Sequence, residues 1–276
     1  MKILSSPSIS KFVCLSIFLG SLFISSSSSA QKGWEAGGWI GVSNYFGDLN
    51  TSTDLTRPGL AFGIIGKRNF NERVSLRGAL SYGRVSGDDA ESSNNFERNR
   101  NLSFRSNLFE FSSVFEFNFF PLIYGSTDNF YTPYILGGFN ITAFNPTAEL
   151  NGNRYSLRDF GTEGQLESGN YASITGGLLF GAGWKWDIGN YTTLNFELGY
   201  RRLFTDYLDD VSTVYPNRGA LPSDIARQLS DRSLIDGLGA PGRQRGDSKG
   251  NDSYTFFSIS LLKYWGKLEC PKISEF

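Results

Sequence analysis

Eight stretches of the chain alternate apolar and polar side chains with the period of two that is typical of β-strands. Along the fourth stretch, phenylalanines from Phe109 to Phe119 share one face, and polar residues such as Ser112 and Asn118 share the other. Each stretch is long enough to cross a bilayer as a tilted strand, which takes about 9–11 residues. The stretches cover residues 34–46, 58–69, 73–86, 105–119, 130–144, 172–187, 191–204 and 253–265.

The connections between these stretches alternate in length. Short connections at 69–72, 120–129 and 187–190 separate long ones at 47–57, 87–104, 145–171 and 205–252. Outer-membrane barrels have this rhythm, with short periplasmic turns and long external loops. A water-soluble β-sandwich would share the side-chain alternation, but it has no reason to alternate its loop lengths. We therefore predict an all-β fold over residues 31–265, an eight-stranded antiparallel up-and-down transmembrane β-barrel with both termini in the periplasm.

Aromatic residues near the strand ends are expected to form girdles at the lipid headgroups, the preferred position of Trp and Tyr in membrane proteins. This set is Trp34, Tyr45, Tyr82, Trp184, Trp186, Tyr264 and Trp265.

The other face of the strands would line the lumen, which eight strands make just wide enough for side chains to fill. The inward set carries both signs of charge, and unpaired buried ions are costly. We therefore expect a paired ionic network that plugs the barrel and makes it an anchor or platform instead of a pore. Its members are Arg77, Glu110, Glu116, Lys185, Glu197 and Arg201.

The first thirty residues have the features of a secretory signal peptide. Lys2 and Lys11 provide positive charge, residues 12–24 are apolar, and Ser28-Ser29-Ala30 suits cleavage by signal peptidase. An N-terminal membrane anchor is the alternative, but the apolar run falls short of the roughly 20 residues that a spanning helix needs.

Composition narrows the function. The chain has no histidine, 26 basic and 27 acidic residues, and therefore no basic field for nucleic acid. Enzymatic small barrels rely on a serine–histidine arrangement, which this chain cannot form, so we expect no enzyme and no cofactor. Membrane lipid is the expected surrounding.

Three acidic residues, Asp206, Asp209 and Asp210, stand together in the long segment 205–252. Calcium prefers such clustered oxygen ligands, but the spacing matches no EF-hand, so we assign no metal and expect solvated or loop-structuring acids. Residues 223–231 predict a short helix with Ser223 as N-cap. The glycines and charges around it favour partial disorder.

Residues 266–276 form a polar tail that we expect in the periplasm. Removal of the signal leaves Cys270 as the one cysteine, which cannot form an internal disulfide. Because disulfides persist in the periplasm, it suggests intermolecular pairing, with a free thiol as the alternative.

Several segments resemble PorG-type outer-membrane barrels of Bacteroidota, which belong to the type IX secretion and gliding machinery. They are GVSNYFGDLN (41–50), RVSLRGALSYGRVSGDDA (73–90), RNLSFRSNLFEFSSVFEFNFF (100–120), LNGNRYSLRDFGTEGQ (150–165), ELGYRRLFTDYLDDVSTVY (197–215), LSDRS (229–233) and CPK (270–272). The resemblance implies a non-enzymatic barrel that anchors the periplasmic ring complex, built from a lipoprotein and its partner, to the outer membrane. With it, Cys270 becomes a candidate for a mixed disulfide with the ring lipoprotein.

Two other functions are compatible with a barrel of this kind. One is a small channel or transporter for solutes or hydrophobic compounds. The other is a surface adhesin that acts through its external loops.

Overall fold

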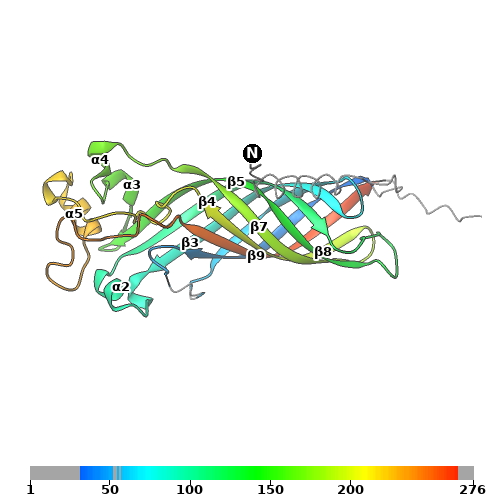
Figure 1. Ribbon diagram of the computed structural model, residues 1–276, viewed down its shortest axis with the longest axis horizontal. Coiled ribbons are helices and arrows are strands. Elements are labelled where there is room, and N and C mark those ends of the chain that lie inside the picture. The colour runs from blue at the N-terminus through cyan, green and yellow to red at the C-terminus, as the bar shows by residue number, and fades with distance from the viewer. Residues whose placement is uncertain (1–31, 52–54, 56, 267–276) are drawn as a thin grey trace, which may run out of the picture.

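Eight long strands form a closed antiparallel barrel (Figure 1) in the computed structural model, which describes residues 32–51, 55 and 57–266. The sheet closes because the first and last strands pair along their whole length, with Gly33 opposite Gly266 and Phe46 opposite Ser253. The barrel strands are β1 (Gly33–Phe46), β2 (Gly59–Asn69), β3 (Val74–Asp88), β4 (Ser103–Asn118), β5 (Tyr131–Leu150), β7 (Ile174–Asp187), β8 (Thr192–Leu203) and β9 (Ser253–Gly266). The predicted fold class and strand number are confirmed.

The largest difference from the predicted strands lies in β5, which continues six residues past residue 144. Its end pairs with a short strand, β6 (Asn153–Ser156), in a hairpin that extends beyond the barrel wall. Asn151 and Gly152 at its tip both have positive φ, as a tight Asn-Gly hairpin turn requires. The sequence did not predict this extension because it contains Pro146, and proline is uncommon inside strands.

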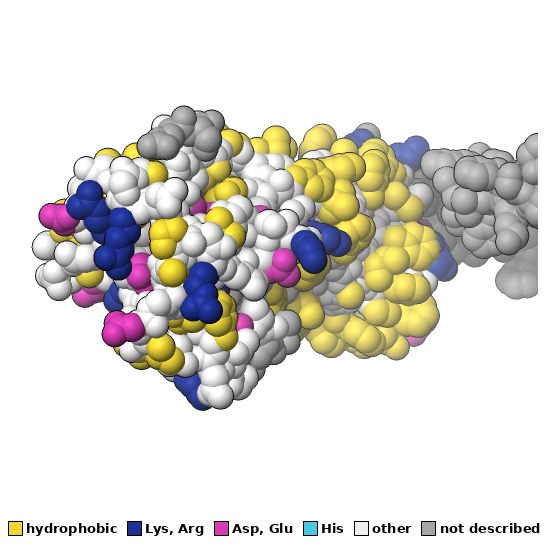
Figure 2. Space-filling view, turned by 60° about the vertical axis from the view of Figure 1, so that its left-hand side comes forward, with side chains coloured by type: hydrophobic (Ala, Val, Ile, Leu, Met, Phe, Trp, Pro, Cys, Tyr) yellow, Lys and Arg dark blue, Asp and Glu magenta, His cyan; other side chains and the backbone are white. Residues whose placement is uncertain are grey.

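The outside of the barrel is an apolar belt (Figure 2). Large hydrophobic side chains on every barrel strand are exposed, which in water would be an unusually large patch. They include Ile40, Ile64, Leu80, Phe109, Phe111, Phe115, Phe139, Phe180, Leu198, Phe257 and Leu261. A closed antiparallel sheet with this outer surface is the architecture of outer-membrane barrels, in which lipid covers the belt.

The predicted aromatic girdle is only partly correct. Trp34 and Trp265 are more than half exposed at the strand ends, and Trp184 is also exposed. Tyr45 and Tyr264, in contrast, are almost fully buried and face the interior. Exposed and buried positions alternate along β1 and β9, and both tyrosines stand at the buried positions. The alternation within each strand therefore already assigns them to the lumen.

The long connections gather at one end of the barrel, where they form a structured cap (Figure 1). We use this term for the described residues of 47–58, 89–102, 151–173 and 204–252. Its helices are η1 (Asp89–Glu91), α2 (Asn95–Arg100), α3 (Leu157–Phe160), α4 (Gln165–Ser168), η2 (Arg218–Ala220) and α5 (Asp224–Ser230). None of the helices in the described chain is long and apolar enough to cross a membrane.

Helix α5 is the helix predicted at 223–231. Ser223 caps it as expected, accepting a hydrogen bond from the backbone N–H of Ala226 at 3.1 Å. The partial disorder expected around this helix is not what the structure contains. Leu221 and Leu229 are buried in the cap, and Val214 forms a β-bridge with Gln244. Apolar anchors spaced along the segment thus outweigh its glycines.

Candidate functional site

The half of the lumen next to the short turns contains a neutral network of three acids and three bases. Glu116 lies at its centre, with carboxylate oxygens 2.5 Å from Lys185 Nζ and 3.0 Å from Arg77 Nη1. Lys67 Nζ lies 3.6 Å from the same carboxylate and 2.7 Å from Glu35. All are buried, so each charge is compensated by its neighbours inside the barrel.

Arg77 joins this lumen network to Glu197. The two side chains form a fork of two bonds, at 2.5 and 3.0 Å, and Tyr134 donates a hydrogen bond to the same carboxylate at 2.7 Å. Bidentate Arg–carboxylate pairs of this kind hold both geometry and charge firmly. The network therefore links strands on opposite sides of the barrel across its interior.

A second pair, Glu110 and Arg201, lies nearer the cap. Arg201 Nε is 3.0 Å from the Glu110 carboxylate, which also accepts a hydrogen bond from Tyr254 at 2.5 Å. The guanidinium lies over the ring of Phe256, 4.3 Å from its centroid. The backbone of Gly199 makes room for it, because a Cβ there would lie 2.4 Å from the guanidinium. The six lumen residues named from the sequence thus fall into two groups.

Glu35 and Lys67 belong to the lumen network but were missing from the predicted set. The signal was present in the sequence, because Glu35 alternates with the lipid-facing Trp34 and Lys67 with Arg68. Their position at strand ends, where charged residues are ordinary, concealed it.

The mouth of the barrel at the turn end is covered by the connection between β4 and β5. Leu122 and Tyr124 are buried there, and the Tyr124 ring stacks on Tyr264 at 4.4 Å. Residues of the lumen network, Glu35 and Lys67, line a small cavity together with these side chains. The connection between β4 and β5 therefore closes the barrel at the end opposite the cap. The short length of this connection did not predict such a role.

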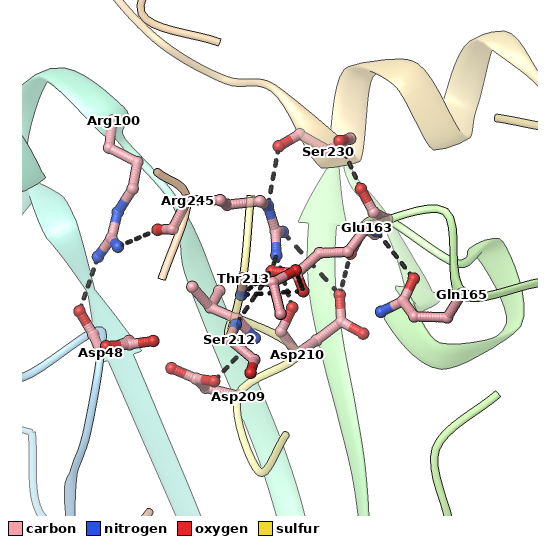
Figure 3. Close-up of polar contacts among 12 residues, drawn as sticks. Asp48, Arg100, Glu163, Gln165, Asp209, Asp210, Ser212, Thr213, Ser230 and Arg245 are labelled. Carbon is pink, nitrogen blue, oxygen red and sulfur yellow. Dashed lines mark hydrogen bonds and ion pairs between the residues drawn. The ribbon is translucent and has the colours of Figure 1, made fainter. Parts of the chain in front are cut away.

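The cap is held together by Arg245, which is only 1% exposed (Figure 3). Its guanidinium lies 2.9 Å from Glu163 and donates to the backbone carbonyls of Asp210 at 2.6 Å and Ser230 at 3.2 Å. Glu163 in turn accepts hydrogen bonds from the backbone N–H groups of Ser212 and Thr213. One buried arginine thereby joins three separate loop segments.

A second arginine extends this cluster toward the first two loops. Arg100 forms two bonds of 2.7 Å with Asp89 and donates to the backbone carbonyls of Asp48 and Arg245. All four long loops therefore contribute to one polar core (Figure 3), which we call the cap cluster. It comprises Asp48, Asp89, Arg100, Glu163, Asp209, Asp210, Ser212, Thr213, Ser230 and Arg245. Nothing in the sequence pattern pairs these residues, because Arg100 and Arg245 lie 145 positions apart.

Two of the three acids predicted as a group, Asp209 and Asp210, point to different partners. Asp210 contacts Thr162, Tyr171 and Arg245, while Asp209 points toward Tyr45. No group of three His, Cys, Asp or Glu side chains within the described residues is arranged to hold a metal ion.

Tyr45 lies between two carboxyls, 2.6 Å from Asp209 Oδ2 and 2.9 Å from Asp252 Oδ1. One phenol proton can serve only one of them, so the other short contact requires a proton on a carboxyl. In agreement, burial raises the pKa of both Asp209 and Asp252 well above its ordinary value, and the other nearby carboxylates raise it further. The cap cluster therefore holds protons as well as ion pairs.

The remaining predicted features, the signal segment 1–30 and Cys270 in the tail 266–276, are outside the described residues apart from Gly266, which ends β9.

Comparison of the sequence with models of protein families assigns the chain to a family. A family model described as a domain of unknown function, DUF6089, matches residues 12–218. The chain belongs to this family. No curated protein shows significant sequence similarity to this DUF6089 member.

Several solved structures of outer-membrane barrels have a similar arrangement of strands. Neisserial surface protein A (NspA) is 10% identical, with a TM-score of 0.42, over 84% of the DUF6089 chain and 97% of its own. Ail of Yersinia pestis is 10% identical, with a TM-score of 0.41 and coverage of 86% and 99%. OprG of Pseudomonas aeruginosa is 10% identical, with a TM-score of 0.42, over 86% of the DUF6089 chain and 98% of its own. The likeness is limited to the barrel architecture.

The cap of this DUF6089 barrel is expected to loosen as pH rises. Burial raises the pKa of Asp206 from 3.8 to about 8, and that of Asp48 and of Asp210 to about 6. Raised carboxyl pKa values mean that the folded cap binds protons more tightly than the unfolded chain. The resulting stability is complete below about pH 4 and is lost as pH rises through about 6 and then about 8. Limited proteolysis of the refolded barrel should therefore cleave the cap faster at about pH 9 than at about pH 6.

The variant Asp206→Asn removes the carboxyl whose pKa is raised to about 8. It should flatten the rise in cleavage above about pH 7, whereas Asp236→Asn, which alters an exposed carboxyl of the same cap, should leave the profile unchanged. Equal pH profiles for all three proteins would contradict this assignment.

Proposed function

We propose that the chain is a non-enzymatic outer-membrane anchor or platform. The observation that carries this proposal is the sealed interior. The lumen is crossed by the buried network around Glu116, covered at the turn end by Leu122 and Tyr124, and covered at the other end by the cap. A barrel filled in this way offers its surfaces and its ends, but no open path, to other molecules.

The finer part of the proposal is that this barrel anchors the periplasmic ring of the type IX secretion and gliding machinery. It is supported by the resemblance of the sequence segments to PorG-type barrels, among them YLDDVSTVY (207–215) and the CPK tail. In this arrangement the cap faces the cell exterior, and both termini lie in the periplasm. The tail beyond β9 would then reach the ring lipoprotein and its partner, with Cys270 as the residue for covalent attachment.

Affinity purification from detergent-solubilised membranes tests the partner. The tagged wild-type chain should recover the ring lipoprotein, and non-reducing gels should contain a high-mass band that collapses on reduction. The variant Cys270→Ser should lose that band, while Ser274→Ala in the same tail should retain it. A band that persists in Cys270→Ser rules out the covalent tether, and purification without any ring protein argues against the secretion role itself.

Conductance in planar bilayers distinguishes the channel alternative from the anchor. Steady conductance of the purified barrel would favour a channel or transporter, whereas the sealed interior predicts none.

A surface adhesin is the other candidate, and one feature of the cap favours it. Leu234 and Ile235 are both more than half exposed at the surface of the cap, away from the lipid-facing belt. Exposed apolar residues outside a membrane commonly mark contacts with other proteins.

A further inference from the structure

A groove on the outer wall of the barrel lies at the boundary between the apolar belt and the cap. It measures about 170 Å³ and runs over the cap ends of three neighbouring strands, β3, β4 and β5, to the hairpin strand β6. Ser86, Arg105, Thr147, Glu149 and Arg154 contribute to its lining.

The groove sits at the level where lipid headgroups begin. Going toward the cap along β4, the lipid-facing positions change from Phe111 and Phe109 to Asn107 and then Arg105. The change marks the end of the hydrocarbon layer, because a charged residue within that layer is costly. Arg105 therefore faces the headgroups of the adjacent leaflet.

Arg105 and Arg154 have no hydrogen-bonded or ion-paired side-chain partner anywhere in the described chain, and both are exposed. Arg84 lies beside Arg105 on the membrane side, since Arg84 is opposite Asn107 and Arg105 is opposite Ser86. Such diagonal neighbours on one face are about 7–8 Å apart. Three arginines thus lie near one another on the outer wall: Arg105 and Arg154 line the groove, and Arg84 next to it donates to Asn107 and Tyr82.

Acidic residues compensate only part of this charge. Arg57 also lines the groove, but it is already paired with Asp88 at 3.0 Å and Glu91 at 2.7 Å. Glu149 lies opposite Arg154 on the paired strand and opposes the arginines with one charge. Taken together, these groups carry four positive charges (Arg57, Arg84, Arg105 and Arg154) and three negative ones (Asp88, Glu91 and Glu149), a net charge of +1.

We propose that this groove binds a phosphate group carried by a lipid of the leaflet on the cap side. A planar guanidinium presents paired donors that match phosphate oxygens, and the two unpaired ones, on β4 and β6 with β5 between them, line the same groove and suit a phosphomonoester with its double charge. The apolar belt directly beneath, with Phe109 and Tyr82, supplies the contact surface for the acyl chains of the same molecule. A membrane lipid satisfies both surfaces at once, whereas free phosphate uses only the arginines.

The asymmetry of the barrel supports a specific site over a general attraction to anionic membranes. Near their cap ends, β1 and β2 carry Val42 and Leu60 on the lipid-facing side, and both are exposed. On β8 the corresponding region carries Arg202, an exposed arginine whose opposite neighbours on the two flanking strands, Leu178 and Ser253, are uncharged. Arg202 therefore serves as a matched control.

The test uses the refolded full barrel in phosphatidylcholine nanodiscs that contain either bis-phosphorylated lipid A or its dephosphorylated form. Native mass spectrometry measures the retained lipid. Wild type should retain the phosphorylated form at least about tenfold more strongly. Because each arginine–phosphate contact is worth about tenfold, Arg105→Gln and Arg154→Gln should each weaken retention about tenfold, and Arg202→Gln should not.

All three substitutions replace exposed side chains, so the barrel should fold in each, which heat-modifiable mobility on gels verifies. Equal retention of the two lipid forms by wild type, or retention unaffected in the double variant Arg105→Gln/Arg154→Gln, would overturn the proposal. Inorganic phosphate added at millimolar concentration should not displace the lipid. Full displacement would identify free phosphate as the ligand and refute the lipid assignment.

Discussion

Replacing Glu116 with glutamine is expected to lower the free energy of unfolding of the barrel by about 3–5 kcal/mol, the usual effect of removing one partner from a buried ion pair. Glu116 is 2% exposed and contacts Lys67, Arg77 and Lys185. Its loss leaves three buried cations with two acids, Glu35 and Glu197, which cannot compensate them. Urea unfolding of the barrel refolded in lipid vesicles, followed by tryptophan fluorescence, measures the change.

A double variant separates the charge from the shape of the side chain. Lys185→Met in the Glu116→Gln background restores neutrality, so it should recover part of the lost stability although it removes a second polar group. Glu149→Gln alters an exposed acid and should change stability by no more than about 0.5 kcal/mol. If Glu116→Gln resembles Glu149→Gln, the lumen network does not stabilise the barrel.

The barrel strands could be predicted from the sequence because each crosses from one interface to the other and keeps one lipid-facing row throughout. In β4 the exposed Phe109, Phe111 and Phe115 alternate with buried Leu108, Glu110 and Val114, so the period of two is visible without any partner strand. A closed sheet imposes this pattern on every strand, which is why the number of strands was correct and every boundary except the end of β5 lies within two residues of the predicted one.

The cap could not be predicted in the same way, because its contacts follow no local period. Arg245 is followed by Gly246 and Asp247, and this triplet has the appearance of an exposed, flexible loop. In the structure its first residue is among the most buried of the cap, paired with Glu163 at a separation of 82 positions. Burial of this kind depends on separate loop segments meeting in space, which composition alone does not encode.

Buried charges are compensated differently in the lumen and in the cap. In the lumen, charges of both signs on different strands neutralise one another, as in Arg77 with Glu116 and Glu197. In the cap, acids exceed the buried bases, and protons on carboxyls such as Asp209 and Asp252 make up the difference. Stability of the cap should therefore depend strongly on pH, through these carboxyls.

Arg245→Met is expected to open the cap while leaving the barrel folded. The substitution keeps most of the side-chain volume but leaves Glu163 buried without its cation and frees two backbone carbonyls, those of Asp210 and Ser230. A loss of about 3–5 kcal/mol in local stability corresponds to at least about a hundredfold more open cap. When opening is fast relative to cleavage, limited proteolysis reports this population directly, so cleavage within 204–252 should accelerate by about the same factor.

Two further variants make the interpretation specific. Arg243→Met removes an exposed arginine two positions away and should leave the cleavage rate within about twofold of wild type. Arg245→Lys keeps the charge next to Glu163 but lacks the planar fork that reaches the two carbonyls, so its rate should lie between those of wild type and Arg245→Met. A lysine variant as labile as the methionine variant would assign the effect to the carbonyl contacts, and an Arg245→Met cap as resistant as wild type would show that the cap cluster is held by its apolar residues instead. Because Arg245 bridges segments that also carry the acids around Tyr45, the Arg245→Met cap should in addition lose the dependence of cleavage on pH, which distinguishes opening of the whole cluster from fraying of a single loop.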